Sequence, residues 1–453
     1  MSSDQNNIKE LYKLFVQFPF ICTDTRKTVP DCLFFCLKGE NFDGNMFVKE
    51  ALEKGARYVI TDNLTVLRSY DFTILKVDNV LQTLQQLARH HRNQLKIPII
   101  GITGTNGKTT TKELMVSVLS KKYKTAFTKG NLNNHIGVPL TLLSIKQDDE
   151  IAVIEMGANH TGEIAELCEI AQPDYGIITN IGKAHLEGFG TVENIIKTKT
   201  ALYRAAKTIF VNGGDEILMR EANKFKSSKI QEFKSLNSKN SYDLTILQSY
   251  GLNYYGKNTE TDAEIVEMNP CLVINLFHKK IQTQLTGNYN LPNILAAAAV
   301  GRFFNVSTEN ICNAIAEYSP QNQRSQIIRN NNNIIIADYY NANPTSVKAA
   351  LDSFLKIDAS QKLAILGDML ELGEKTLSEH QAIIDFCETN KIETCFIGDN
   401  FYALKNERSL FFTNVEEFNN YLKSHLNIEE KWRATSIILI KGSRGIHLEN
   451  ISF

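Results

Sequence analysis

The segment Gly101-Ile-Thr-Gly-Thr-Asn-Gly-Lys-Thr-Thr110 is the most informative part of the sequence for the fold. It follows the apolar run Ile99–Thr103, which predicts a buried strand, and it opens a helical pattern from Thr109 to about residue 123. A glycine-rich turn between a strand and a helix presents backbone N–H groups and the positive end of the helix dipole to an anion. Lys108 adds a full charge, and Thr109 offers a hydroxyl to the Mg²⁺ that accompanies nucleotide phosphates. The stretch therefore predicts a nucleotide-phosphate site.

One position departs from the usual phosphate-loop pattern. That pattern places a glycine five residues before its last glycine, and here the residue is Ile102. The surrounding strand, turn and helix, together with the Gly-Lys-Thr ending, still favour the phosphate interpretation over a chance glycine-rich turn.

Alternating strand and helix patterns surround the loop. Continuous Ile/Val strands separated by helices indicate a parallel sheet covered on both faces. We expect further strands at Ile151–Met156, Tyr175–Ile181 and Thr208–Val211, then an antiparallel meander over about 235–290 and an alanine-rich helix at Asn293–Phe304.

The two ends of the chain carry patterns of their own. Before the loop, we expect a small mixed α/β unit with strands at Cys32–Leu37, Arg57–Thr61 and Thr73–Val77 and a helix at Val80–Asn93. After it comes a second doubly wound series. Its expected strands are Asn333–Tyr339, Leu363–Leu366, Thr394–Ile397 and Ser436–Ile440, its helices lie near 345–356, 378–389 and 415–425, and Asn330–Asn333 is an exposed hairpin turn.

The predicted fold class is therefore α/β, with three domains. These are a small mixed α/β domain at 1–97, a central P-loop parallel-sheet domain that binds ATP at 98–322, and a Rossmann-like domain at 323–453. A chain of 453 residues is long enough for several hydrophobic cores.

Composition excludes several classes of protein. The net charge is -1, which gives no general attraction to nucleic acid or to an anionic membrane. The polar start MSSDQNNIKE lacks the apolar core of a secretory signal, and no run approaches the roughly 18–20 apolar residues of a membrane span. The eight cysteines have no zinc-site spacing and are expected to be reduced, mostly buried thiols. We expect a cytoplasmic monomer.

Several further motifs occur in a fixed order around the loop. They are Asn131-Leu-Asn-Asn-His-Ile-Gly-Val-Pro139, Glu155-Met-Gly-Ala-Asn-His160, Thr179-Asn-Ile-Gly-Lys-Ala-His-Leu-Glu187, Lys197 and Lys199, Asn290-Leu-Pro-Asn293, Arg324, and Asp338-Tyr-Tyr-Asn-Ala-Asn-Pro344. Together with the loop, this ordered set resembles the Mur ligase superfamily over nearly the whole chain.

The two ends narrow the resemblance. Asp24-Thr-Arg26 and Leu33–Gly44 are similar to a uridine-nucleotide-binding first domain. Tyr340–Pro344, Gly367-Asp-Met-Leu-Glu-Leu-Gly373 and Lys441-Gly-Ser-Arg-Gly445 resemble the member that adds D-alanyl-D-alanine to UDP-N-acetylmuramoyl-tripeptide. Alternatives left open are the member that adds the third stem residue, a folylpolyglutamate synthase, a P-loop NTPase switch, and a silent binding protein that kept the fold.

The resemblance implies an activity: ATP phosphorylates a carboxylate, and an amine attacks the acyl phosphate. The implied catalytic residues are Lys108, His185, Lys199 and Arg324. The implied ATP site comprises Gly104, Thr105, Asn106, Gly107, Lys108, Thr109, Thr110, Asn290, Asn293, Arg324 and Asp338. The two asparagines would bind adenine and Asp338 the ribose, and Lys441 would join Arg324 in supplying positive charge.

Two Mg²⁺ ions are implied, held by Thr109, Glu155, His185 and Lys199. Lys199 serves only if it is carried as a carbamate; the alternative is an unmodified lysine that contacts phosphate or a carboxylate. Lys197 lies on the opposite side of a helix, so both lysines cannot serve one site.

The substrate sites are also implied by the resemblance. The UDP-substrate residues would be Asp24, Arg26, Phe34, Gly39, Asp43, Gly44, Asn131, Asn133, Asn134, Asn159 and His160. The dipeptide residues would be Asn341, Asn343, Ser443 and Arg444. Turn chemistry alone also explains Asn-Ala-Asn-Pro. The sequence does not decide whether the third stem residue is diaminopimelate or lysine.

Overall fold

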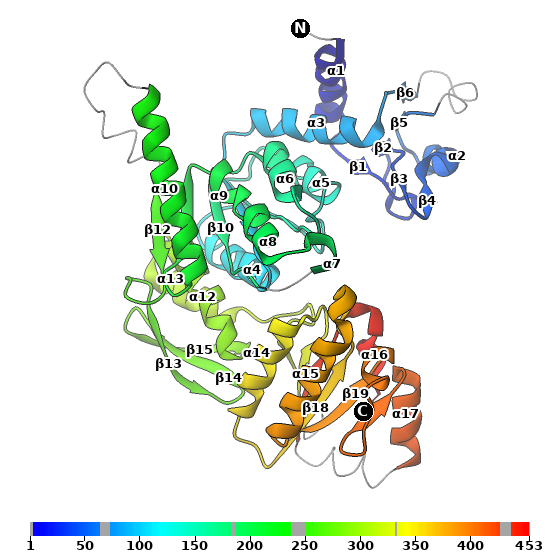
Figure 1. Ribbon diagram of the computed structural model, residues 1–453. Helices are drawn as coiled ribbons and strands as arrows, with labels where there is room; N and C mark the ends of the chain where they lie inside the picture. Colours follow the sequence, from blue (N-terminus) through cyan, green and yellow to red (C-terminus); the bar gives the residue numbers. More distant parts are fainter. Residues whose placement is uncertain are drawn as a thin grey trace.

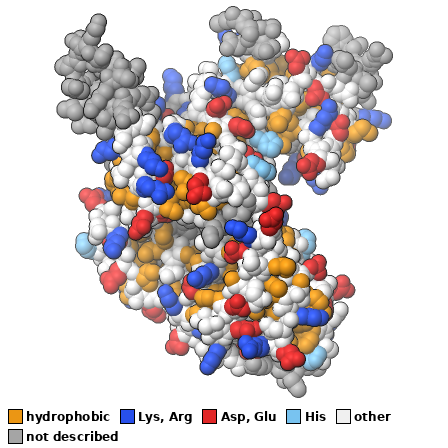
Figure 2. Space-filling view, viewed as in Figure 1, with side chains coloured by type: hydrophobic (Ala, Val, Ile, Leu, Met, Phe, Trp, Pro, Cys, Tyr) orange, Lys and Arg blue, Asp and Glu red, His pale blue; other side chains and the backbone are white. Residues whose placement is uncertain are grey.

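The computed structural model describes residues 3–63, 73–182, 186–236, 251–330, 333–425 and 436–452. The chain forms three successive lobes (Figure 1), each built on its own parallel or mainly parallel sheet. In the space-filling view the molecule is hollowed between the N-terminal and C-terminal lobes, which project from the central lobe on the same side (Figure 2).

The N-terminal lobe is a four-stranded parallel sheet with strand order β1-β2-β5-β6. The strands are β1 (Ile21–Cys22), β2 (Leu33–Phe35), β5 (Tyr58–Thr61) and β6 (Ile74–Lys76), and β3 (Lys38–Gly39) and β4 (Phe42–Asp43) form a separate ribbon. The helices are α1 (Ser3–Gln17), α2 (Val48–Glu53) and α3 (Val80–Gln94), with short 3-10 turns η1 (Thr25–Lys27) and η2 (Gly44–Phe47). The three predicted strands and the helix at Val80 are confirmed, with ends shifted by one or two residues.

Helix α3 joins this lobe to the central one. Its N-cap is Asn79, whose side chain accepts a hydrogen bond from Gln82 N. Leu84 and Leu87 on its buried face belong to a core that runs on into the central lobe, where α3 packs against α5 (Gly137–Leu143) and α6 (Glu163–Ala171). Near its end, Arg92 donates to Asp174 at 2.8 Å. The first two lobes therefore share one core.

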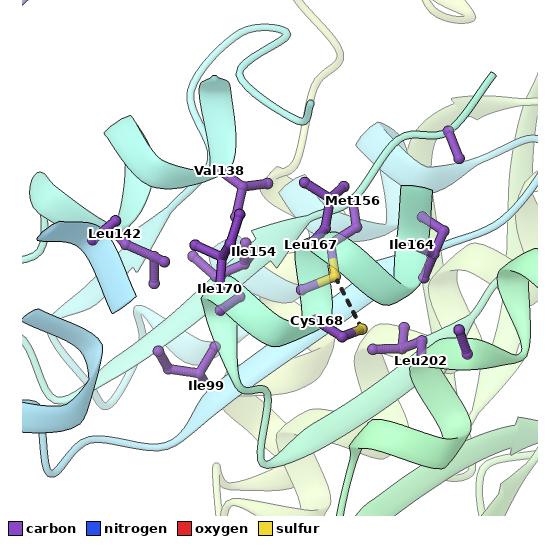
Figure 3. Close-up of a cluster of buried hydrophobic side chains, with 14 of the residues drawn as sticks. Ile99, Val138, Leu142, Ile154, Met156, Ile164, Leu167, Cys168, Ile170 and Leu202 are labelled. Atoms are coloured by element: carbon purple, nitrogen blue, oxygen red, sulfur yellow. Dashed lines mark hydrogen bonds between the residues drawn. The ribbon is translucent and has the colours of Figure 1, made fainter. Parts of the chain in front are cut away.

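The central lobe is a six-stranded, wholly parallel sheet of order β12-β11-β10-β7-β9-β8. Its strands are β7 (Ile99–Thr103), β8 (Thr125–Phe127), β9 (Ile151–Glu155), β10 (Tyr175–Ile178), β11 (Thr208–Asn212) and β12 (Leu252–Tyr255). One face is covered by α5, α6 and α9 (Ala201–Ala205), with Val138, Leu167 and Leu202 packed on it (Figure 3). The other face is covered by α4 (Lys108–Leu119), α12 (Leu291–Phe303) and α13 (Thr308–Glu317).

One sequence expectation for this lobe is partly wrong. The antiparallel meander begins later than expected: β13 (Ala263–Met268), β14 (Cys271–Leu276) and β15 (Lys279–Thr286) form a three-stranded antiparallel sheet. Leu252–Tyr255, assigned to the meander from sequence, instead extends the parallel sheet along β11. Residues 237–250 of the expected meander lie outside the described part.

The C-terminal lobe is a second six-stranded sheet, with order β16-β17-β21-β18-β19-β20. Its strands are β16 (Gln326–Asn330), β17 (Asn333–Asp338), β18 (Gln361–Gly367), β19 (Glu393–Ile397), β20 (Leu410–Phe412) and β21 (Ser436–Lys441), and its longer helices are α14 (Pro344–Leu355), α15 (Thr376–Thr389) and α17 (Val415–Ser424). Only the β16–β17 hairpin is antiparallel. β16 and β17 form the expected hairpin, but Asn330 and Asn333 are paired strand residues and Asn333 is buried, against the predicted exposure. Residues 331–332 lie outside the described part.

The strand directions bring the sequence motifs together. β7 ends at the phosphate loop and β9 ends at Glu155, while β17 and β21 end at Asp338 and Lys441. Ligands of parallel sheets bind at the carboxyl ends of the strands, so two sheets contribute to one site. Within the described residues, no helix has the length and apolar character needed to cross a membrane.

Candidate active site

The phosphate loop has the backbone that its glycines allow. Gly104 has φ 148° and Gly107, the residue before α4, has φ 79°. A Cβ at position 104 would lie 1.9 Å from Thr179 Oγ1, so only glycine fits there. Thr179 donates to Asn106 O at 2.6 Å, and Asn180 exchanges two hydrogen bonds with Asn106. The ends of β7 and β10 therefore fix the loop before any ligand binds.

Two buried lysines converge on this loop. Lys108 Nζ donates to the carbonyls of Gly104 (2.7 Å) and Thr105 (3.1 Å), and Lys199 Nζ, from α8 (Val192–Lys199), donates to the same Gly104 carbonyl at 3.0 Å. Burial lowers the pKa of Lys108 to about 8, while Glu155 acts in the opposite direction. Burial and the Lys108 charge hold the pKa of Lys199 well below its usual value. Because burial disfavours the charged form of both lysines, a polyanion such as a nucleotide phosphate beside the loop would stabilise that form.

The geometry of α8 explains why its two lysines differ in exposure. Lys199 is 3% exposed, whereas Lys197 is exposed, as the helical spacing predicts. Lys199 lies behind the loop and does not line the cavity described below.

Glu155 ends β9 beside the start of α4. Its Oε1 accepts from Thr109 Oγ1 (3.2 Å) and Asn133 Nδ2 (2.9 Å), and the side chain is 2% exposed. Its Oε2 is buried and has no hydrogen-bond partner. The nearest cation to this oxygen is the fully buried Lys112, at 3.7 Å, which also donates to Thr128 O at 2.9 Å.

These residues fit one divalent cation. A buried carboxylate oxygen that accepts no hydrogen bond and a neighbouring threonine hydroxyl are oxygen ligands suited to Mg²⁺. Among the described residues, no three His, Cys, Asp or Glu side chains gather into a metal cluster. His185, the residue implied for a second ion, lies outside the described residues. The second ion therefore stays a prediction.

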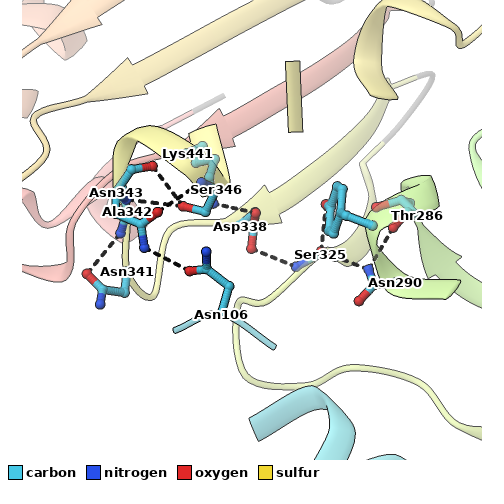
Figure 4. A network of polar contacts seen from close by, with 11 residues as sticks. Asn106, Thr286, Asn290, Ser325, Asp338, Asn341, Ala342, Asn343, Ser346 and Lys441 are labelled. Atoms are coloured by element: carbon cyan, nitrogen blue, oxygen red, sulfur yellow. Dashed lines mark hydrogen bonds and ion pairs between the residues drawn. The ribbon is translucent and has the colours of Figure 1, made fainter. Parts of the chain in front are cut away.

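The side of the site expected to bind the nucleoside is made by α12 and the last lobe (Figure 4). Asn290 Nδ2 donates to Thr286 O at 2.7 Å, and Asn293 donates to Asn290 Oδ1 at 2.9 Å. Asp338 accepts from Ser325 N (3.1 Å) and pairs with Lys441 Nζ at 2.6 Å. The predicted adenine and ribose residues therefore lie near one another, but each already has protein partners.

Lys441 supplies its charge to Asp338 in this arrangement. From the sequence, Lys441 is expected to bring its positive charge to ATP phosphate or to a substrate carboxylate. Because the pair is nearly buried, with side chains 3% and 13% exposed, Lys441 first compensates Asp338.

Two arginines of the last lobe share one aromatic ring. The Arg324 guanidinium lies 4.0 Å from the ring centroid of Tyr340, and that of Arg444 lies 5.3 Å away. The buried Nε of Arg324 has no hydrogen-bond partner. A guanidinium that is stacked but not fully bonded can donate to a ligand oxygen.

These groups surround one cavity of about 790 Å³ between the central and C-terminal lobes. Asn343 Nδ2 donates to Asn106 Oδ1 at 2.8 Å and so joins the last lobe directly to the phosphate loop (Figure 4). The sequence-predicted residues that line the cavity are Thr105, Asn106, Gly107, Lys108, Thr109, Thr110, Asn131, Asn133, Asn134, Glu155, Asn159, His160, Asn290, Asn293, Arg324, Asp338, Asn341, Asn343 and Lys441.

The candidate uridine residues of the first lobe lie elsewhere. Asp24 and Arg26 form a bidentate surface pair, with Nη2 to Oδ2 at 2.7 Å, and the Arg26 guanidinium holds the pKa of Asp24 at about 2. Asp43 accepts from Asn45 N, and a Cβ at Gly44 would lie 2.8 Å from Leu37 O. None of them lines the cavity.

The side chain of one uridine candidate is buried. Phe34 is 1% exposed and packs in the small core beneath α2 with Cys32 and Val59, so its ring cannot contact a base. The exposed ring in this segment is Phe42, 51% exposed and packed on Gly39. The neighbouring residues distinguish the two rings in the sequence, because Phe34 lies in an apolar run and Phe42 is flanked by polar residues.

The two candidate dipeptide residues after β21 do not line the cavity. Ser443 is 4% exposed, and its hydroxyl accepts a hydrogen bond from Leu370 N at 3.0 Å. Arg444 reaches the cavity only through its contact with Tyr340. In this arrangement the Ser443 hydroxyl holds the loop after β18.

The sequence interpretation also left out two residues of the site. Lys112 follows Lys108 by four positions and so lies on the same face of α4, a spacing that predicts its approach to Glu155. Tyr340 lies within one of the sequence motifs, but nothing in its spacing shows that two arginines stack on it.

Comparison with known proteins agrees with this geometry. Residues 17–92 match the Mur ligase family, catalytic domain; residues 102–301 match the Mur ligase middle domain; and residues 323–444 match the Mur ligase, glutamate ligase domain. The UDP-N-acetylmuramoyl-tripeptide–D-alanyl-D-alanine ligase of Bacillus subtilis is 32% identical, over 95% of this chain and 92% of its own. The Escherichia coli protein of the same name is 30% identical, over 98% and 94%.

Solved structures give the same result. MurF from Acinetobacter baumannii superposes with a TM-score of 0.81 at 29% identity, covering 95% of this chain and 91% of that one. MurF ligase from Thermotoga maritima in complex with ADP gives 0.77 at 25% identity, covering 95% of each chain. The chain therefore belongs to the Mur ligase family.

Proposed function

We propose that the chain joins D-alanyl-D-alanine to UDP-N-acetylmuramoyl-tripeptide, with ATP converted to ADP and phosphate. The observation that carries this proposal is the single cavity in which a phosphate loop, a row of central-lobe asparagines and the Asn-Ala-Asn-Pro turn of the last lobe meet. Relatives that carry this enzyme's name align with nearly the full length of the chain. A cytoplasmic location and a monomeric state stay predictions.

The first step places the ATP phosphates over the start of α4. The loop N–H groups and Lys108 bind them, and Arg324 approaches from the last lobe with a free Nε. The carboxylate of the tripeptide attacks the terminal phosphorus, the bond to the bridging oxygen of ADP breaks, and an acyl phosphate results. The protein contributes mainly positioning and charge stabilisation to this step.

His185 and a carbamylated Lys199 are proposed ligands of a second Mg²⁺ ion, while Thr109 and Glu155 would hold the first, at the ATP phosphates. When bound, this ion supplies charge neutralisation at the phosphate oxygens. Asn133 holds the Glu155 carboxylate in place, and Lys112 balances part of its charge. The lowered pKa of Lys199 favours the neutral amine, which is the form that reacts with carbon dioxide.

In the second step the amine of D-alanyl-D-alanine attacks the acyl carbon, the new amide bond forms, and inorganic phosphate leaves with the electrons of the acyl–oxygen bond. Asn341, Asn343 and Arg444 are the proposed dipeptide contacts. Closure of the last lobe excludes water that would otherwise hydrolyse the acyl phosphate. The Asn343–Asn106 hydrogen bond supports a closed arrangement in which the last lobe reaches the loop.

The test is phosphate release by the purified protein with ATP, Mg²⁺ and UDP-N-acetylmuramoyl-tripeptide. D-Alanyl-D-alanine is compared with diaminopimelate, lysine and glutamate as the amine. We expect release only with the dipeptide. Release with a single amino acid would indicate another Mur-type ligase, and release without the UDP-linked substrate would indicate a nucleotide switch.

A further inference from the structure

A buried histidine lies beneath the last lobe's two substrate-side loops. His380, on α15, is fully buried, and its Nε2 accepts a hydrogen bond from Met369 N at 3.0 Å. Its Nδ1 donates to Thr376 O at 2.6 Å. These two contacts require the neutral ring with its proton on Nδ1. Burial lowers the pKa of His380, which favours that neutral form.

The loop that His380 holds begins at Asp368, directly after β18. The Asp368 carboxylate accepts from the backbone N–H groups of Asn400 and Phe401, both at 2.9 Å, and its Oδ1 lies 3.5 Å from His380 Nε2. Neither Asp368 nor His380 lines the cavity. Both residues therefore act on the loop and not on a ligand.

This loop is bonded to the one that follows β21. Ser443 N donates to Asp368 O at 3.0 Å, and Leu370 N donates to Ser443 Oγ at 3.0 Å. A Cβ at Gly442 would lie 2.8 Å from Gly367 Cα, so glycine is required at position 442 for the loops to approach this closely. A displacement of Met369 or Leu370 is thereby transmitted to Ser443.

The second loop leads to the cavity. Arg444 begins the short turn η6 (Arg444–Ile446) directly after Ser443 and stacks over Tyr340, which lines the cavity and also contacts Arg324. The first loop also reaches the central lobe, because a Cβ at Gly373 would lie 3.6 Å from Glu187 Cβ. One histidine thus supports a chain of contacts that ends at the dipeptide side of the site.

We propose that His380 is a positioning residue for the incoming dipeptide: through the Met369 amide it fixes the loop after β18, and through Ser443 that loop places Arg444 against Tyr340. The proposal rests on the proposed function. A substitution of His380 is therefore expected to affect the binding of only one of the three substrates, although its side chain does not line the cavity.

The experiment compares two polar substitutions of different reach. In His380→Asn the side chain still donates to Thr376 O but cannot reach the Met369 amide, whereas in His380→Gln an acceptor is restored near the position of Nε2. We expect the asparagine variant to raise the KM for D-alanyl-D-alanine about tenfold, with kcat and the KM for ATP changed by less than about twofold. The glutamine variant should recover most of the loss.

The matched control is His91, the buried histidine of α3, which is bonded to Tyr12 OH and Ile145 O far from the cavity. His91→Asn should lower Tm and leave the dipeptide KM unchanged. An unchanged dipeptide KM in His380→Asn, or an equal rise in every KM, would overturn the proposal. So would a glutamine variant that behaves like the asparagine variant. Wild-type protein that cannot use D-alanyl-D-alanine would instead refute the proposed function.

If the asparagine variant does not fold, amide hydrogen exchange in the wild type provides the test. The Met369 and Leu370 amides should exchange slowly without ligand, and more slowly still when D-alanyl-D-alanine is added to the enzyme with ATP analogue and UDP-linked substrate. Exchange at the rate of an exposed loop would contradict the proposal.

Discussion

The phosphate-loop corner of the central lobe and the surface turn of the first lobe both carry charges that we assign to substrate, but they hold them in opposite ways. In the corner, Lys108 and Lys199 are buried beside one carbonyl and their pKa values are lowered. At the turn, Asp24 and Arg26 neutralise each other in water, with the arginine side chain 85% exposed. A buried charge depends on protein or ligand for compensation, whereas water compensates an exposed one. The corner should therefore govern both chemistry and stability, and the turn only the affinity for one substrate.

The largest expected effect is that of Lys108→Ala. Removal of the charge over the loop should lower phosphate release by about a thousandfold, because Lys108 lines the cavity at the start of α4 whereas Lys199 lies behind the loop. The dissociation constant of the UDP-linked substrate, measured by calorimetry, should stay within about twofold of wild type. Full activity in this variant would contradict the proposed role of Lys108 in the phosphate loop. It would also contradict the proposed difference between the two regions.

Glu155→Gln comes next. The substitution keeps the size of the side chain but removes the charge of the unpartnered Oε2, so we expect a rate about a hundredfold lower and a higher Mg²⁺ concentration at half-maximal activity. Glu166→Gln, an exposed carboxylate at the same cavity, is the control and should change neither. An unaltered Mg²⁺ dependence in Glu155→Gln would contradict the metal assignment.

The third prediction concerns stability against pH. The pKa of Lys108 is about 8 in the folded chain against its usual 10.5, so between these pH values the unfolded chain binds more protons. The free energy of unfolding should therefore rise with pH across this window, by about 3 kcal/mol from this group. The free energy of unfolding, measured by denaturant titration at several pH values, should rise more steeply with pH in wild type than in Lys108→Met across this window. Equal pH dependence in the two proteins would refute the burial effect.

Asp24→Asn should have the smallest effect. Because the pair with Arg26 is at the surface, we expect Tm to stay near that of wild type. The KM for the UDP-linked substrate should rise several-fold and the KM for ATP should not change. A rise in the ATP KM would show that the first lobe affects the nucleotide site and that the two regions are not independent.

Much of the site could be read from local sequence because its chemistry is local. The segment from Ile99 to Thr109 is one strand, one turn and one helix start, and its predicted role depends on backbone groups that this short segment supplies itself. The strands at Ile99 and Ile151 were predicted nearly to the residue, since buried parallel strands are continuous apolar runs.

Other features depend on contacts between distant segments. Leu252–Tyr255 has no local pattern that distinguishes the edge of a parallel sheet from a meander strand, and only its pairing with β11 decides. Phe34 and Phe42 are both aromatic residues in one motif, and their opposite exposure follows from packing against α2 and Gly39. No spacing reveals that His380 bonds the Met369 amide.

Local sequence was sufficient to predict a three-domain α/β fold, the phosphate loop and many of the residues that line the cavity at the carboxyl ends of the strands. The folded chain establishes which buried charges are compensated within the protein: Lys441 compensates Asp338, and Glu155 accepts hydrogen bonds through one oxygen alone. Backbone conformation and strand burial follow from neighbours along the chain, so local sequence predicts them. The state of a buried charge, in contrast, follows from the dielectric and the partners around it, and the partner of Asp338 is 103 residues away in the sequence.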